Sequence, residues 1–360
     1  MSAMPGDPSS ILVVKLSSIG DVVQSLPVAA ALRRRFPQAC LAWAVGPAAA
    51  EVVAGNPHLT ETLVIGGGGG DGAGGQWRVR AVPPVSAPRR LRQALRRYGF
   101  QLSLDLQGLL KSALIAYLSG ARERIGYRNL QEGAFLFNNR RLVPDRRDVH
   151  AVEAYLGFAE ALGASRGPLD FTIATSEADR RRADDLVEGK RDLAALIPGA
   201  RWESKRWPAA RFAALADALR EAFGLTSVVV GGEGDTAVAA EIAAAASIPI
   251  LDLTGRTTLK QAAEVFRRCR VTVGNDTGPL YISAAVGTPT VAVFGPTDAA
   301  RLGPYGEGHA KVTSGLRCSP CRRRRCRPLR CMGEIAPEKV VEAVGSLLGG
   351  AQAGGRGVGT

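Results

Sequence analysis

The feature that most constrains the fold is a regular alternation of short β-rich runs with longer helical stretches. In the first half a helix is predicted over 21–35, and short apolar runs typical of buried strands lie at 11–14, 40–45, 62–65 and 102–106. Strands that alternate with helices pair in parallel sheets whose two faces are both covered. The pattern therefore predicts an α/β fold.

A second series of the same kind begins after a helical stretch at 150–164 and a turn-rich linker at 165–176. A further helix is predicted over 209–223. The predicted strands lie within 193–199, 226–235, 248–255, 271–278 and 288–298. Each half is thus predicted to form its own doubly wound sheet.

The length of 360 residues allows two domains of ordinary size. We predict one domain at 1–168, a second at 169–348, and a disordered Gly-rich tail at 349–360. Ligands of doubly wound sheets bind beyond the carboxyl ends of the strands, here in a cleft between two halves. The loops that follow strands are therefore the first places to look for chemistry.

Composition indicates a folded, soluble protein, because 46% of the residues are hydrophobic and 22% are charged. No run of 18 apolar residues is free of Gly, Pro and charge, and the first ten residues lack the features of a secretory signal. We therefore expect a cytoplasmic protein without a transmembrane helix. The Gly-rich segment 66–76 is predicted to be a loop without chemistry.

The net charge of +13 suggests an anionic partner, such as nucleic acid, a membrane surface or a phosphorylated substrate. Only seven of the 46 cationic residues are Lys, however, and a GC-rich genome produces the same Arg bias without selection for binding. The positions at which the cationic residues cluster are more informative than the net charge. They lie at 89–97, on a predicted helix, and at 317–331.

The first strand-end loop, "KLSSIGD" at 15–21, ends on Asp21 near the start of the predicted helix. Asp is favoured at a helix start, where it accepts hydrogen bonds from N–H groups and faces the positive end of the helix dipole. The alternative is a carboxylate that takes a proton from a bound hydroxyl. The loop by itself leaves both interpretations open.

Two further loops carry candidate groups for a nucleotide ligand. Lys205 lies in "ARWESKRWP", where a cation can neutralise a phosphate, although a solvated basic loop is as good an explanation. Glu233 follows a β run and two glycines, and an acid in that position can accept hydrogen bonds from ribose hydroxyls. The spacing is not that of a dinucleotide-binding fingerprint.

The fourth loop contains Asp276, Thr277 and Gly278, followed by a proline suited to the first turn of a helix. Free N–H groups at a helix start, together with the Thr277 hydroxyl, make an anion site suited to a diphosphate. An ordinary capped helix is the alternative. Four such loops at strand ends in two halves favour a functional role.

The cysteines at 318, 321, 326 and 331 follow the spacing C-x2-C-x4-C-x4-C. Four thiolates with this spacing suit a closed tetrahedral zinc site, and the surrounding arginines would stabilise thiolates and could contact phosphates. Free thiols or partial disulfides are the alternatives. The candidate metal ligands are Cys318, Cys321, Cys326 and Cys331.

Together these motifs resemble the heptosyltransferases of lipopolysaccharide core synthesis, which have the GT-B fold of two Rossmann-like domains. The resemblance covers nearly the whole chain. "DLQGLLKSA" and "HAVE" are most similar to heptosyltransferase I, and the other segments include "KLSSIGDVVQSLP", "IGYRN", "SKRWP", "GNDTGPLYISAAVGTPTVAVFGPTD" and "CSPC". The resemblance implies an inverting transfer of heptose from ADP-heptose to a hydroxyl of a lipid-linked anionic acceptor.

The resemblance also implies a role for each matching residue. Asp21 would be the general base, and Lys205 would contact the donor phosphates. Glu233 would hold the ribose. The remaining implied donor-binding residues are Asp276, Thr277, Gly278 and Tyr281, and the implied acceptor-side residues are Ser18, Gly20, Gln107, Lys111 and Ser112.

Tyr281 departs from the family pattern, which has His at this position. Tyr can form a hydrogen bond but supplies no cation near neutral pH. No cofactor is expected for catalysis, apart from zinc at the cysteines. We expect a monomer in peripheral contact with the inner membrane. The alternatives are a basic zinc-knuckle protein that binds nucleic acid and a nucleotide-sugar epimerase of the same fold.

Overall fold

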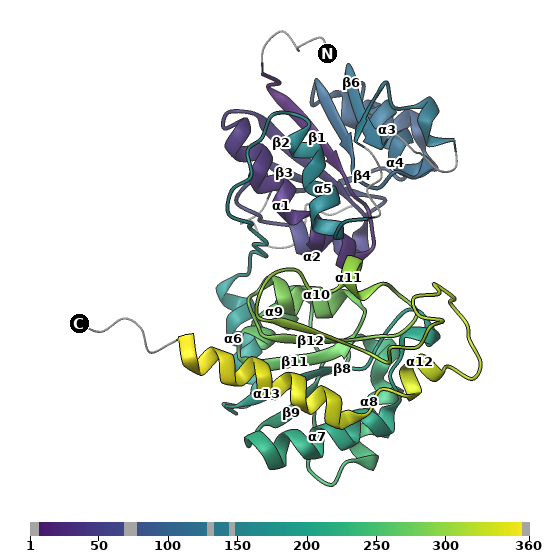
Figure 1. Cartoon of the computed structure of the whole chain (residues 1–360). Coiled ribbons are helices and arrows are strands. Elements are labelled where there is room, and N and C mark those ends of the chain that lie inside the picture. Colours follow the sequence, from purple (N-terminus) through teal and green to yellow (C-terminus); the bar gives the residue numbers. More distant parts are fainter. Residues whose placement is uncertain (1–6, 68–77, 128–132, 144–147, 355–360) are drawn as a thin grey trace. The chain divides into compact units, whose positions relative to one another are not determined.

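The computed structural model describes residues 7–67, 78–127, 133–143 and 148–354 (Figure 1). The chain divides into two compact units, residues 1–174 and 175–360. Residues 164–176 contain no helix or strand, in agreement with the predicted linker. The predicted domain boundary at residue 168 lies within this segment.

The N-terminal unit is built on a seven-stranded parallel sheet with the order β4-β3-β2-β1-β5-β6-β7. Its central strands are fully buried, because helices cover both faces. The strands are β1 (Ser10–Val14), β2 (Cys40–Val45), β3 (Glu61–Ile65), β4 (Val79–Val82), β5 (Leu102–Asp105), β6 (Glu123–Tyr127) and β7 (Arg140–Val143).

Side chains that alternate along β1 point to opposite faces of this sheet. Leu12 and Val14 pack with α3 and α4, while α1 packs against α5 and α2. The helices are α1 (Ile19–Arg35), α2 (Ala50–Val53), α3 (Pro88–Arg96), α4 (Leu110–Leu118) and α5 (Ala151–Glu160). In α3 only Leu91 and Leu95 are buried, so the predicted basic helix is amphipathic with an arginine-rich exposed face.

The C-terminal unit contains a six-stranded parallel sheet with the order β10-β9-β8-β11-β12-β13. Most of the predicted strands of this half are confirmed, although β10 is shorter than its apolar run. The strands are β8 (Leu193–Ile197), β9 (Thr226–Val229), β10 (Leu251–Asp252), β11 (Cys269–Asn275), β12 (Thr290–Phe294) and β13 (His309–Thr313).

Helices cover both faces of this second sheet as well. The helices α7, α8 and α13 pack on one face through a continuous apolar core, and α10 and α6 pack beside α9 (Figure 1). The helices are α6 (Glu177–Val187), α7 (Ala209–Phe223), α8 (Thr236–Ala245), α9 (Leu259–Arg267), α10 (Gly278–Ala285), α11 (Ala299–Leu302), α12 (Arg330–Gly333) and α13 (Pro337–Gly354). The prediction of two doubly wound sheets is confirmed.

The strand order reverses beside a central strand in each sheet. From β1 the chain runs outward through β2, β3 and β4, and then returns to place β5 on the other side of β1. In the second unit β8 lies between β9 and β11 in the same way. Loops that leave the carboxyl ends of such a strand pair diverge and leave a crevice, which is where ligands of these folds bind.

Four strands were missed by the sequence analysis: β4, β6, β7 and β13. Three of them lie at sheet edges, and β6 is next to an edge. Edge strands keep exposed polar or charged residues, as in β4 (VRAV) and β13 (HAKVT). They therefore lack the continuous apolar run by which a central parallel strand is recognised.

The predicted disordered tail is partly wrong, because α13 continues to Gly354. The helix is anchored on the core through Val340, Val344 and Leu348, and the residues that follow can continue its hydrogen-bond pattern. Residues 355–360 lie outside the described residues. The same holds for most of the Gly-rich segment 66–76 and for part of "IGYRN". No helix in the described part of the chain is long and apolar enough to cross a membrane.

A glycine in β11 allows the two central strands of the second sheet to pack closely. A Cβ on Gly274 would lie 2.6 Å from Cβ of Ile197 in β8. We predict that Gly274→Ala lowers the free energy of unfolding by about 1–3 kcal/mol, because the added methyl group overpacks the core. Urea denaturation measures the change.

The matched control is Gly232→Ala. Gly232 has a φ of −80°, and a Cβ there would meet no atom within 4 Å. This variant should unfold like the wild type. Equal stability of the Gly274→Ala variant and the control would contradict the predicted overpacking.

Candidate active site

Asp21 lies in the first turn of α1, directly beyond the carboxyl end of β1. Its Oδ2 accepts hydrogen bonds from the Ser18 backbone N–H (3.0 Å) and hydroxyl (2.6 Å), and its Oδ1 accepts one from the Tyr155 hydroxyl (3.2 Å). The contact with the Ser18 N–H is the half of a capping box in which the carboxylate caps the helix start, as the structural interpretation of Asp21 predicted. The Asp21 residue is nevertheless partly exposed, at the crevice between the loops that follow β1 and β5. Capping and a chemical role are therefore compatible.

Lys15 is a functional candidate that the sequence analysis missed. It follows β1, is only 5% exposed, and its Nζ lies 4.8 Å from the ring centroid of Tyr155. It interacts electrostatically with the carboxylates of Asp21 and Asp105. A charged residue directly after a buried apolar strand was a usable signal, because an ionised Lys is rarely buried without a partner.

The ionisation of Asp21 depends on this arrangement. Burial by itself raises the pKa of Asp21, but the charge of Lys15 and the hydrogen bonds from Ser18 and Tyr155 outweigh burial and lower the pKa. Burial also lowers the pKa of Lys15, while Asp21 and Asp105 oppose that effect. Asp21 is thus kept as a carboxylate, the form that can accept a proton.

The loop after β5 meets the loop after β1 at the crevice. The Gln107 Oε1 accepts hydrogen bonds from the backbone N–H groups of Leu16 (2.7 Å) and Ser17 (3.2 Å). Gln107 therefore fixes the backbone just before Asp21. Ser18 is exposed there, while Gly20 is buried inside the first turn of α1.

The other acceptor-side candidates separate into an exposed and a buried residue. Lys111 is exposed on the first turn of α4, where it is free to meet an anion. Ser112 is fully buried, and its hydroxyl donates to the Leu109 carbonyl (2.9 Å) while accepting from the Leu109 N–H (3.1 Å). The structure therefore gives Ser112 a capping role, which differs from the predicted acceptor contact. Its burial results from the packing of α4 on the sheet.

Asp276 is the centre of the polar cluster in the C-terminal unit. It directly follows β11 and is 7% exposed. Its Oδ2 accepts from Lys205 Nζ (2.6 Å) and the Thr297 hydroxyl (2.7 Å), and its Oδ1 accepts from the Tyr281 hydroxyl (2.6 Å). Lys205, which was selected from a different motif, thus lies together with Asp276 and Tyr281. Thr297, after β12, was not selected by the sequence analysis.

The backbone around this cluster is fixed by Asn275. Its Nδ2 donates to the Pro198 carbonyl (2.7 Å), and its Oδ1 accepts from the Trp207 backbone N–H (3.0 Å). These contacts join the loop after β8 to the end of β11, which are the two elements beside the switch point of this sheet. Thr277 occupies the N-cap position of α10 with an extended backbone and without a capping hydrogen bond from its side chain, and Thr277 and Gly278 are partly exposed.

Glu233 is exposed after β9, at the same edge of the sheet. The Lys205 Nζ lies 4.6 Å from the ring centroid of Trp202, in addition to its bond with Asp276. The crevice of the C-terminal unit thus contains Lys205, the N-terminus of α10 and, further along the same sheet edge, the Glu233 carboxylate. These groups suit a nucleoside diphosphate, with the phosphates near Lys205 and α10 and a ribose near Glu233.

The four cysteines of the predicted zinc site differ in their exposure. Cys318 and Cys321 are exposed, Cys326 is partly exposed and Cys331 is buried, and all four are free thiols. No group of three or more His, Cys, Asp or Glu side chains in the described ranges is placed to hold a metal ion. The zinc site stays a hypothesis that rests on the spacing and on the electrostatic interaction of the Cys331 thiol with those of Cys318, Cys321 and Cys326.

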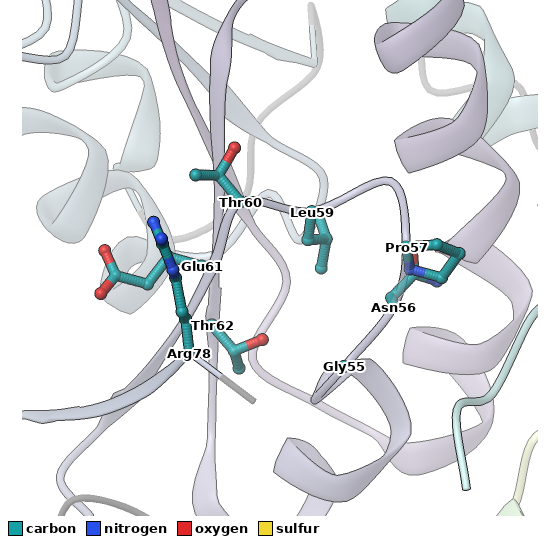
Figure 2. A pocket seen from close by; sticks show the side chains of 8 residues that line it. All are labelled: Gly55, Asn56, Pro57, Leu59, Thr60, Glu61, Thr62 and Arg78. Atoms are coloured by element: carbon teal, nitrogen blue, oxygen red, sulfur yellow. The ribbon is translucent and has the colours of Figure 1, made fainter. Parts of the chain in front are cut away.

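A pocket of about 270 Å³ lies in the N-terminal unit, between the loop after α2 and the start of β3. Figure 2 shows its side chains, which include Asn56, Glu61, Thr62 and Arg78. This pocket is at the amino ends of the strands, whereas Asp21 follows a carboxyl end. None of the candidate site residues lines it, so we assign it no part in the chemistry.

Two doubly wound units, each with a polar cluster at its switch point, are the architecture of the GT-B fold. A family model described as glycosyltransferase family 9 (heptosyltransferase) matches residues 88–331. The chain belongs to this family and is a glycosyltransferase.

Relatives and solved structures agree with this assignment. The lipopolysaccharide heptosyltransferase 1 of Pseudomonas aeruginosa is 30% identical over 88% of this chain and 87% of its own length. The structure of Escherichia coli ADP-heptose lps heptosyltransferase II has a TM-score of 0.76 at 23% identity, covering 95% of this chain and 99% of its own. The structure of E. coli heptosyltransferase WaaC with ADP has a TM-score of 0.70 at 23% identity, covering 94% of this chain and 99% of its own. The latter two show the fold.

Lys15 provides a test of how Asp21 is kept ionised. In Lys15→Met, burial still raises the pKa of Asp21 but the opposing charge is lost, so Asp21 becomes protonated at higher pH. We predict that the acidic limb of the pH profile of kcat/KM moves to higher pH. Initial rates measured across the acidic range test this.

The matched control is Tyr155→Phe, which removes one hydrogen bond to Asp21 but leaves the lysine. Its acidic limb should move in the same direction by a smaller amount. An unchanged acidic limb in Lys15→Met would show that Lys15 does not control the ionisation of Asp21.

Proposed function

We propose that this enzyme transfers a heptose from ADP-heptose to a hydroxyl of the lipopolysaccharide inner core, such as Kdo-lipid A or a related lipid-linked glycan. One observation carries the chemical part of this proposal. Asp21 is a partly exposed carboxylate at the switch point of its sheet, and it is kept ionised by Lys15, Ser18 and Tyr155. Such a group is suited to be a general base.

In the proposed reaction, Asp21 takes the proton of the acceptor hydroxyl as that oxygen attacks the anomeric carbon. The bond from the anomeric carbon to the diphosphate breaks at the same time, and the configuration inverts. The leaving ADP gains negative charge, which Lys205 and the N–H groups at the start of α10 would stabilise. Glu233 would hold the ribose.

The names of the relatives support the choice of donor and acceptor. The Pseudomonas relative is a lipopolysaccharide heptosyltransferase 1, and solved structures with the same fold are named for ADP-heptose or contain ADP. Family membership favours neither a nucleic-acid-binding protein nor an epimerase. No metal is needed for the proposed transfer.

A lipid-linked acceptor also suggests where the protein works. We propose a cytoplasmic monomer that contacts the inner membrane peripherally. The arginine-rich exposed face of α3 is suited to anionic headgroups, and Lys111 to an anionic acceptor.

Replacement of Asp21 by Asn separates its two roles. Asn can still accept the hydrogen bonds from Ser18 that cap α1, but it cannot take up the proton of the acceptor. We predict that Asp21→Asn stays folded and binds ADP normally, but unfolds at a lower temperature, because buried Lys15 loses one of its two carboxylate partners, and loses at least about a hundredfold in turnover. Near-wild-type turnover of the purified variant would remove Asp21 from the mechanism.

Donor specificity tests the other half of the proposal. Isothermal titration with ADP, UDP and GDP should show the strongest binding for ADP. In turnover assays, ADP-heptose should be used in preference to other nucleotide sugars. A preference for UDP or GDP would overturn the heptose assignment while leaving the family and the fold intact.

A further inference from the structure

The arginine-rich cysteine segment, residues 317–331, has no role in the proposed reaction. It is nevertheless tied to the loops at the carboxyl edge of the second sheet. The Ser319 hydroxyl donates to the Gly295 carbonyl, and the Arg322 N–H donates to the Pro296 carbonyl (2.7 Å). Both acceptors directly follow β12. The segment is therefore attached next to the candidate donor site.

A third contact ties the segment to the lysine loop itself. The Ser204 hydroxyl donates to the Arg323 carbonyl (2.7 Å), and Ser204 immediately precedes Lys205. Through this contact the Arg324 guanidinium lies over Trp202, 5.3 Å from the ring centroid to Cζ. The same ring carries Lys205 Nζ at 4.6 Å. Lys205 and Arg324, which are 119 positions apart in the sequence, thus both contact the ring of Trp202.

The charge balance of the cluster indicates why a second cation is useful. The ammonium of Lys205 is already paired with the Asp276 carboxylate at 2.6 Å, and Tyr281 is neutral where the family pattern has His. These three side chains therefore offer little net positive charge to a diphosphate. The N–H groups of a helix start add only a partial charge.

Arg324 can supply the missing charge. Its side chain is exposed, and a guanidinium that lies over an aromatic face can keep its N–H groups free for a planar, bidentate contact with phosphate oxygens. The contact with Trp202 also limits the conformations of a long side chain, which lowers the entropy cost of binding.

We propose that Arg324 is a further binding residue for the diphosphate of the nucleotide sugar, placed beside Lys205 by the cysteine segment and supported on Trp202. This inference rests on the proposed function, because it requires a nucleoside diphosphate donor in this crevice. It gives the segment a role in donor binding that is independent of any metal.

The test compares Arg324→Gln with Arg325→Gln by isothermal titration with ADP at fixed ionic strength. Both changes remove one positive charge from the same exposed segment. We expect Arg324→Gln to weaken ADP binding about tenfold or more, because a charge-assisted contact is lost. Arg325→Gln should change it less than about twofold, and Arg324→Lys should recover part of the loss.

Three results would overturn the inference. Equal weakening by Arg324→Gln and Arg325→Gln would show only a general effect of charge. Equal weakening of adenosine and ADP binding would show a loss of site structure, because adenosine has no phosphate. Unchanged ADP binding with a raised KM for the acceptor would assign Arg324 to the acceptor.

Titration of the same variants with UDP distinguishes this inference from the proposed function. If the wild-type protein prefers UDP, the proposed donor is wrong, and the role of Arg324 is then judged on UDP. A tenfold loss of UDP binding in Arg324→Gln alone would support a diphosphate contact with a different donor. No loss would overturn both proposals.

Discussion

The reversal of strand order beside β1 and β8 is the constraint on which the rest of this structure depends. A parallel sheet requires each strand to be followed by a crossover, so the loops at all carboxyl ends lie at one edge. Where the order reverses, neighbouring loops lead to opposite faces and leave room between them. The loops after β1 and β5 meet in this way in one unit, and those after β8 and β11 in the other. The polar clusters around Asp21 and Asp276 each lie at one of these two points.

Each crevice contains a lysine and carboxylates that are buried to different degrees. Lys15 lies among Asp21, Asp105 and Tyr155, and Lys205 is bonded to Asp276. Burial of a charge is costly unless it is paired and hydrogen-bonded, so each cluster must be completed by neighbouring donors and acceptors. The consequences differ between the units. In the first, the lysine keeps a carboxylate ionised, which is the form that can accept a proton. In the second, the Asp276 carboxylate holds the Lys205 ammonium and offsets its charge. A further cation near this pair would therefore strengthen the binding of an anionic ligand.

The sequence predicted which loops contain the candidate site residues. It did not predict which side chains from other loops and helices form hydrogen bonds with them. Asp21, Lys205 and Asp276 were selected because they follow apolar runs, and all three lie at carboxyl ends of strands. The partners were missed because nothing local marks them. Tyr155 is 134 positions from Asp21, and Thr297 is 21 from Asp276. Ser112 shows what position in a motif does not reveal, because packing buries this residue and its hydroxyl bonds to the Leu109 backbone. Edge strands such as β13 were missed because exposed charges interrupt their apolar pattern.

By itself, the sequence determined that the chain forms two doubly wound α/β units and that its acids and lysines follow strands. These properties depend on local composition and on the period of apolar residues, which any segment carries with it. Which of those residues meet, and in what ionisation state, depends on how the elements pack. The tertiary structure placed Lys15 against Asp21, paired Lys205 with Asp276, and brought Arg324 to the ring of Trp202. The physical reason is that burial and charge pairing depend on distances between segments far apart in the chain, which sequence spacing does not specify.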